Sequence, residues 1–323
     1  MTKHKNASLF IQDPAFKLLE GQPKPDFMLI GAAKSGTTSF SSYIGSHPQV
    51  KAPPYKEPNF WTWKMPTAKH YQDLFVNTES LLAPTAQQKI SGDYTADLIL
   101  HPLAPRRVRG SLPHIRIVVL LRNPIDRAYS HYIMSKRSGR EDHQSFSAVV
   151  EKEIDEIPSL LESHRRAFLD LQPRTTQHFL KPDGSPIVTA THDETWTPRV
   201  LRSREDMMFY YYTSCVFRSI YCDQLWRWLQ MYPREQVMII QSENFFSAPK
   251  KIMTKISDFL NLQAFEFDTG ELDRAWGGGA SDDFEKSGDY VPMASETRSL
   301  LRAFFKPFNQ TLYSLIGEQF DWE

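Results

Sequence analysis

The stretch FMLIGAAKSGTT, residues 27–38, decides the fold of this 323-residue chain. Its first four residues form an apolar run that ends at a glycine, which is typical of a buried parallel strand. Beyond it, Phe40, Tyr43 and Ile44 recur at helical spacing, and Gly45 follows as a C-terminal cap. The pattern predicts a strand, a glycine-containing loop and a helix. Backbone N–H groups at the start of such a helix bind anions.

The position of Lys34 separates this loop from that of nucleoside-triphosphate enzymes. Their P-loop reads GxxxxGK[ST], with the lysine directly after the second glycine. Here Thr37 takes that place, and Lys34 precedes Gly36 by two residues. A lysine so placed lies over the outer side of a 5′-linked group, which disfavours a kinase or ATPase. The alternative is a turn with a surface lysine, but the position between strand and helix favours a phosphate site.

A second strand-to-helix junction follows later in the chain. IRIVVLL at 115–121 is β-branched and apolar, as a strand covered on both faces is. Arg122 follows this strand, and Ser130 lies about two turns into the helix that begins at Pro124, so the two side chains can hold one phosphate. Arg127 is open to another interpretation, that of a solvated or ion-paired arginine. Two anion sites indicate a nucleotide with phosphates at both ends of its ribose.

A third strand at 237–240 is followed by a helix at about 248–260. This alternation predicts an α/β fold, in which a central parallel sheet is flanked by helices on both faces. Because both loops must reach one nucleotide, we expect the strands at 27–30 and 115–121 to be neighbours at the centre of the sheet.

The length allows one large α/β domain or two small ones. Residues 1–25 are polar and predict an N-terminal arm, and residues 26–323 predict a single domain. Within it, the charged and turn-rich region 139–206 breaks the alternation of strands and helices. We interpret this region as an insertion on the acceptor side of the site.

Composition excludes several functions. Hydrophobic residues make up 41% of the chain and charged residues 24%, as in ordinary globular proteins. Lys+Arg and Asp+Glu are both 38, so no global basic field is available to hold nucleic acid or an anionic membrane. No apolar run reaches the roughly 18 residues of a membrane-spanning helix, and no signal-peptide core is visible. We therefore expect a cytoplasmic protein without a membrane segment, or one of the Golgi lumen if an N-terminal anchor has been removed.

The two cysteines, Cys215 and Cys222, lie in a stretch with apolar residues at helical spacing. Seven helical residues span about 10 Å, which is too far for a disulfide. We expect two partly buried free thiols, and their spacing indicates neither a metal site nor a nucleophile. No metal-ligand motif is visible elsewhere, so no metal ion is expected.

The two phosphate motifs, in this order, resemble those of the PAPS-dependent sulfotransferase family, where PAPS is 3′-phosphoadenosine-5′-phosphosulfate. KSGTT at 34–38 resembles the family's 5′-phosphosulfate loop, and RNPIDRAYSHY at 122–132 resembles its 3′-phosphate motif. The similarity includes KEPNFW at 56–61 and covers roughly 26–138 and 214–323. The whole pattern is most similar to the carbohydrate branch, with its heparan- and chondroitin-type enzymes.

This resemblance implies a P-loop-like three-layer fold and a set of site residues. Arg122 and Ser130 would hold the 3′-phosphate, and Glu57 would be the catalytic base. Two departures matter: KSGD at 286–289 stands where the family often has Lys-Gly-Arg, and 92–95 lacks the catalytic lysine of some members. The other nucleotide contacts implied are Lys34, Ser35, Gly36, Thr37, Thr38, Lys286 and Gly288.

Sulfuryl transfer requires positioning, charge neutralisation at the leaving oxygen and a base for the acceptor proton. Lys34 suits the neutralisation, with the hydroxyls of Thr37 and Thr38 assisting. Glu57 lies in a segment rich in aromatic residues, which would raise its pKa and keep it an effective base. The alternative is that Glu57 pairs with a neighbouring lysine, and Asp93 is then the second candidate for the base.

The predicted function is transfer of the sulfuryl group of PAPS to a hydroxyl of a carbohydrate or sugar-like acceptor, with adenosine 3′,5′-bisphosphate as the product. The alternative is a cytosolic enzyme that sulfates a small-molecule metabolite on oxygen or nitrogen, because the resemblance implies Golgi anchoring for glycosaminoglycan enzymes and no anchor is seen. Two other classes, a Mg²⁺-dependent small-molecule kinase and a non-catalytic PAPS-binding module, are disfavoured by the place of Lys34 and the presence of Glu57.

Overall fold

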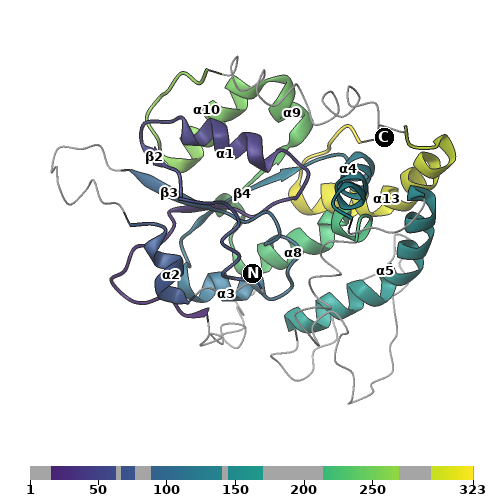
Figure 1. Cartoon of the computed structure of the whole chain (residues 1–323), viewed down its shortest axis with the longest axis horizontal. Helices are drawn as coiled ribbons and strands as arrows, with labels where there is room; N and C mark the ends of the chain where they lie inside the picture. The colour runs from purple at the N-terminus through teal and green to yellow at the C-terminus, as the bar shows by residue number, and fades with distance from the viewer. Residues whose placement is uncertain are drawn as a thin grey trace.

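The computed structural model describes residues 16–62, 67–76, 89–139, 145–169, 214–268 and 292–322. At its centre is a five-stranded parallel sheet with the strand order β2-β3-β1-β4-β5 (Figure 1). β1 therefore lies in the middle, between β3 and β4. The strands are β1 Phe27–Leu29, β2 Val50–Lys51, β3 Ile90–Tyr94, β4 Arg116–Leu121 and β5 Val237–Gln241.

Side chains along β1 and β4 alternate between two hydrophobic clusters, one on each face of the sheet. Met28 and Val119 belong to the larger cluster, whereas Leu29 and Val118 belong to the smaller one. All four side chains are fully buried. The central strands are therefore covered on both faces, as their continuous apolar sequences predict.

Helices close both clusters and complete three layers, which confirms the predicted P-loop-like α/β architecture. The smaller cluster is closed by helices that lie together on one face of the sheet in Figure 1: α1 Thr37–Gly45, α9 Ser242–Ser247 and α10 Pro249–Leu260. The larger cluster contains side chains of α2 Ala68–Asp73, α3 Ala104–Ser111, α4 Pro124–Arg137, α5 Phe146–Leu169, α8 Tyr221–Met231 and α13 Ser295–Ile316.

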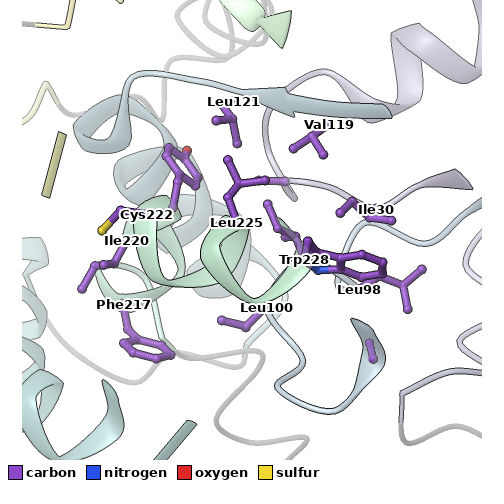
Figure 2. Packing of buried hydrophobic residues seen from close by; sticks show 14 of the residues in the cluster. Ile30, Leu98, Leu100, Val119, Leu121, Phe217, Ile220, Cys222, Leu225 and Trp228 are labelled. Atoms are coloured by element: carbon purple, nitrogen blue, oxygen red, sulfur yellow. The ribbon is translucent and has the colours of Figure 1, made fainter. Parts of the chain in front are cut away.

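Figure 2 shows how α8 packs beneath the sheet. Leu225 and Trp228 are directed at the underside of Ile30, Val119 and Leu121. All five side chains are fully buried, and burial of one large apolar side chain contributes about 1.5–3 kcal/mol. The segment that precedes α8 is therefore anchored to the central sheet through this packing.

The three predicted strands are present, and β1 and β4 are hydrogen-bonded neighbours, as predicted. β2 and β3 were not predicted. β2 is only two residues long, and β3 reads ISGDY, which lacks an apolar run. Gly92 is needed in β3 because a Cβ there would lie 2.5 Å from the Phe27 ring.

Cys215 and Cys222 are buried free thiols, as expected. The prediction that one helix carries both is wrong, because only Cys222 lies in α8. Cys215 precedes a 3₁₀ helix, η3 Phe217–Ser219. The carboxylate of Glu153 accepts the N–H groups of residues 215–217, and these bonds hold the backbone in a separate turn.

Parts of the predicted arm and insertion pack against the core. Phe16 and Leu18 are buried, and the Leu18 N–H donates to Ser111 Oγ at 3.2 Å. In the region 139–206, α5 contributes buried side chains to the larger cluster. A second 3₁₀ helix, η4 Arg234–Gln236, precedes β5. Within the described ranges, no helix is long and apolar enough to cross a membrane.

Candidate active site

The loop between β1 and α1 leaves the start of α1 open. The Phe40 N–H makes a 2.9 Å bond to Gly36 O, so the N–H groups of residues 36–39 have no acceptor inside the helix. Among the described residues no side chain caps this end. Gly36 has a φ of 90°, which favours glycine, and a Cβ there would lie 2.8 Å from the Phe246 ring. Open N–H groups at a helix start are suited to an anion.

Hydrogen bonds from β4 and from the start of α9 fix this loop. The Leu120 N–H donates to Gly31 O at 2.8 Å, and Ser242 Oγ donates to Ser35 O at 2.8 Å. Lys34 has a φ of 72°, in the left-handed region that non-glycine residues rarely adopt. Such conformations persist where surrounding contacts impose them, and they cluster at functional sites.

Three cationic side chains gather around the loop. Arg122 Nη1 donates to Lys34 O at 3.4 Å, and Lys56 Nζ donates to Thr38 Oγ1 at 3.1 Å. Burial lowers the pKa of Lys34, and nearby arginines, Arg122 foremost, lower it further. Burial also lowers the pKa of Lys56. No carboxylate in the described part of the chain pairs with Lys34 or Arg122, so the cluster is short of negative charge.

The second predicted anion site lies where β4 passes into α4. Arg122 is half-buried, and its carbonyl accepts a 2.9 Å hydrogen bond from Tyr221 Oη. Asn123 caps α4, because its side-chain oxygen accepts the Ile125 N–H at 3.0 Å. Ser130 is half-buried about two turns further on. Arg122 and Ser130 thus belong to one strand-to-helix junction, beside the first loop.

Arg127 is fully buried, so the interpretation of a solvated arginine is wrong. Its Nε donates to Ser219 Oγ at 2.5 Å, and Nη2 donates to Cys215 O. Its Nη1 donates to Ala33 O at 3.4 Å. The guanidinium therefore ties α4 to the first loop and to the segment around η3.

Glu57 is held against the end of β3. Its N–H donates to Tyr94 O at 3.3 Å, and its Oε2 accepts the Ala96 N–H at 3.1 Å. Its φ of 58° is also left-handed. Burial raises the pKa of Glu57 to about 8, and the negative charges of Asp97 and Asp93 contribute to the rise. A carboxylate with a raised pKa is a stronger base than an exposed one.

Asp93, in β3, is enclosed by side chains. It accepts hydrogen bonds from Tyr71 Oη at 2.8 Å and from Thr95 Oγ1 at 2.6 Å. Tyr71 Oη in turn accepts from Trp61 Nε1 at 2.9 Å. Burial raises the pKa of Asp93 to about 6. Because Asp93 is fully buried and both its oxygens are engaged, the arrangement suits support of neighbouring residues better than contact with substrate.

Sequence reasoning missed two charged residues of this region. Lys56 reaches the first turn of α1, and Asp97 lies beside Glu57. The sequence signal for Lys56 is its place at the start of KEPNFW, directly before Glu57, and Asp97 has none. Of the predicted nucleotide contacts, Lys286 and Gly288 lie outside the described residues.

The family profile for the sulfotransferase domain matches residues 24–276 of the chain. The chain belongs to the sulfotransferase family. It carries a PAPS-dependent sulfotransferase domain, which confirms the predicted enzyme class and the predicted co-substrate.

This sulfotransferase is 27% identical over 336 residues to the membrane-associated sulfotransferase kil1 of Dictyostelium discoideum, covering 93% of the chain and 66% of the relative. It is 24% identical over 335 residues to heparan sulfate glucosamine 3-O-sulfotransferase 6 of Mus musculus, covering 98% of the chain and 80% of the relative. A solved sulfotransferase from Alicyclobacillus acidocaldarius matches with a TM-score of 0.59 and 22% identity, covering 92% of this chain and 97% of that one. The last match confirms the fold.

The expectation of a cytoplasmic location is wrong. A membrane-associated relative and relatives that act on heparan sulfate point away from that compartment. The expectation rested on composition and on the lack of an apolar run of membrane-spanning length, and neither property determines the compartment of a protein.

Proposed function

We propose that this sulfotransferase transfers the sulfuryl group of PAPS to a hydroxyl of a carbohydrate acceptor. The observation that carries the proposal is the 3.1 Å hydrogen bond from Lys56 Nζ to Thr38 Oγ1. This bond joins the residue before Glu57 to the first turn of α1, so the candidate base and the phosphosulfate loop share one edge of the sheet. Relatives that sulfate heparan sulfate glucosamine support a carbohydrate as the acceptor class.

The cationic cluster fits a nucleotide with phosphate groups at both ends of its ribose. The open N–H groups of residues 36–39, with Lys34 and Thr38, suit a 5′-phosphosulfate. Arg122 and Ser130 suit a 3′-phosphate. β1 and β4 are adjacent, so their loops begin about 5 Å apart and both can reach one nucleotide. Bound anions would also relieve the repulsion that lowers the pKa of Lys34.

Glu57 would accept the proton of the acceptor hydroxyl. The acceptor oxygen would then bond to sulfur as the bond from sulfur to the bridging phosphate oxygen breaks. PAPS, when bound, supplies the activated sulfuryl group and its phosphate leaving group. Lys34 and the N–H groups of α1 would stabilise the charge that grows on the leaving oxygen. Lys56 lies between these groups and Glu57. Asp93 would hold the residues around Glu57 in place and would not contact substrate.

We also propose that no metal ion is needed, because the lysines and the helix start can supply the positive charge. The test is transfer of labelled sulfate from PAPS to heparan sulfate oligosaccharides, with hydroxylated and aminated metabolites in parallel, and with and without EDTA. We expect label in the oligosaccharides that EDTA does not reduce. Label only in the metabolites would reject the carbohydrate acceptor. Tight binding of adenosine 3′,5′-bisphosphate without any transfer would reject catalysis, and tighter binding of ATP–Mg²⁺ would indicate a kinase.

A further inference from the structure

A largely buried ion pair lies immediately beside Glu57. Ala96, whose N–H binds the Glu57 carboxylate, directly precedes Asp97 in the chain. The Asp97 carboxylate accepts a charge-assisted hydrogen bond from the Arg218 guanidinium. The side chains of Asp97 and Arg218 are 19% and 5% exposed, so their charges are only weakly screened by solvent.

The backbone of Arg218 is held by two helices. Its carbonyl accepts a 3.1 Å hydrogen bond from Gln224 Nε2 of α8. On either side of it, the Arg127 guanidinium binds Ser219 Oγ and Cys215 O. The segment that carries Arg218 therefore rests on α4 and α8, and the guanidinium is presented to Asp97 from a fixed base.

We propose that Asp97 and Arg218 are positioning residues for the proton-transfer step, an inference that rests on the proposed role of Glu57 as the base. Arg218 holds the turn at residues 96–97, and the Ala96 N–H in that turn orients the Glu57 carboxylate. Arg218 also offsets part of the charge of Asp97, so Glu57 faces a weaker negative field than an unpaired aspartate would impose. The pair thereby links the base to the helix that carries the 3′-phosphate motif.

Of the acids near Glu57, Asp97 is the one whose influence on the pKa of Glu57 depends on a paired cation. Asp97 and Asp93 raise the pKa of Glu57, and Lys56 lowers it. Asp93 is bound by the hydroxyls of Tyr71 and Thr95, and no cation pairs with it among the described residues. Asp97 is thus the acid near Glu57 whose effect an arginine controls.

The experiment follows the Glu57 carboxyl by ¹³C NMR titration of the full chain, with glutamate labelled at Cδ and the resonance assigned from Glu57→Gln. Asp97→Asn removes a negative charge and should lower the midpoint by about 0.5–1 pH unit. Arg218→Gln leaves Asp97 unpaired and should raise the midpoint by a similar amount. Arg218→Lys keeps the charge and should stay near wild type. Arg166→Gln, which breaks a pair with Glu162 within α5, is the matched control.

Shifts in the same direction for Asp97→Asn and Arg218→Gln, or none in either, would overturn the proposal. If Arg218→Gln does not fold, Asp97→Asn and Arg218→Lys decide it. The pH dependence of transfer to heparan sulfate oligosaccharides is measured on the same variants, and its acid limb should follow the NMR midpoint. If the midpoints move as expected but Glu57→Gln remains active, the pair controls the pKa of Glu57 but Glu57 is not the base, and the proposed function and the positioning role fail together. If Glu57→Gln is inactive but the midpoints do not move as expected, only the positioning role fails.

Discussion

The two ends of this site differ in charge although they belong to one sheet. The loops that follow β1 and β4 gather cations, and burial with mutual repulsion lowers the pKa of Lys34. The region around the end of β3 gathers the carboxylates of Glu57, Asp93 and Asp97, and burial with mutual repulsion raises the pKa of Glu57 to about 8. Lys56 lies between the two regions, beside Glu57 in sequence and bonded to Thr38 in space.

Each region is electrostatically incomplete by itself, and under the proposed mechanism the two regions do different work. The cationic region gains most from an anionic donor, because bound phosphate offsets its repulsion. In the acidic region, Glu57 binds a proton more tightly than an exposed carboxylate does, and a general base must take up a proton. Charge substitutions in the two regions should therefore have different kinetic signatures.

The largest effect is expected for Glu57→Gln in the acidic region. The change keeps the shape of the side chain but removes the proton acceptor, so kcat should fall about 10²–10⁴-fold. The affinity for adenosine 3′,5′-bisphosphate, measured by calorimetry, should barely change. Asp93→Asn is the comparison, and we expect it to retain more activity. Full activity in Glu57→Gln together with loss in Asp93→Asn would exchange the roles of the two acids.

In the cationic region, Arg122→Ala should weaken binding of adenosine 3′,5′-bisphosphate about 30–150-fold. This corresponds to about 2–3 kcal/mol for one lost charge-assisted contact. Lys34→Ala should reduce both nucleotide affinity and kcat, since Lys34 also faces the charge of the leaving group. Arg166→Ala, on α5, is the control and should bind normally. Unchanged affinity in Arg122→Ala would remove it from the 3′-phosphate site.

The residue between the two regions should show a smaller, mixed effect. Lys56→Met keeps the length of the side chain but removes the bond to Thr38 and the charge that lowers the pKa of Glu57. We expect kcat at pH 7 to fall about tenfold and its acid limb to move to higher pH. Lys69→Met, on the exposed face of α2, should leave the profile unchanged. A pure loss of nucleotide affinity would assign Lys56 to the cationic region alone.

The smallest effect concerns stability. The pKa of Glu57 is raised from its ordinary value of 4.5 to about 8, so the folded protein holds this proton more tightly than the unfolded chain. The wild type should therefore lose stability as pH rises from about 4.5 to about 8. At pH 8–9, Glu57→Gln should melt roughly 2–4 °C higher than wild type, which is the effect of about 1 kcal/mol. At pH 4 the variant and the wild type should melt at the same temperature. Calorimetric scans that differ by the same amount at both pH values would contradict this.

Local sequence predicted the cationic region well. The strand at 27–30, its glycine loop and the helix after it are contiguous, and so are IRIVVLL and Arg122. Hydrophobic period and loop chemistry are local properties, so one sequence carries them. The prediction that these two strands are adjacent came from the requirement that both loops reach one nucleotide.

The acidic region could not be predicted in the same way, because it is built from contacts across the chain. Lys56 meets Thr38 across 18 residues, Glu57 meets Ala96 across 39, and Asp97 meets Arg218 across 121. No spacing rule encodes such pairs. Asp93 was recognised as an acid near the site, but its enclosure depends on Tyr71, which folds back from α2. Glu57 was found through the family resemblance.

The strand order gives the meeting of Lys34 and Arg122 a topological cause. After β1 the chain passes into α1 on one face of the sheet, and after β4 it passes into α4, whose apolar side chains join the cluster on the other face. Two neighbouring parallel strands whose connections leave toward opposite faces form a switch point, and a crevice opens between their loops. The proposed location of the nucleotide site is thus a property of the path of the backbone. Side-chain substitutions there can change which anion binds and how tightly, but only a rearrangement of the strands would move the switch point.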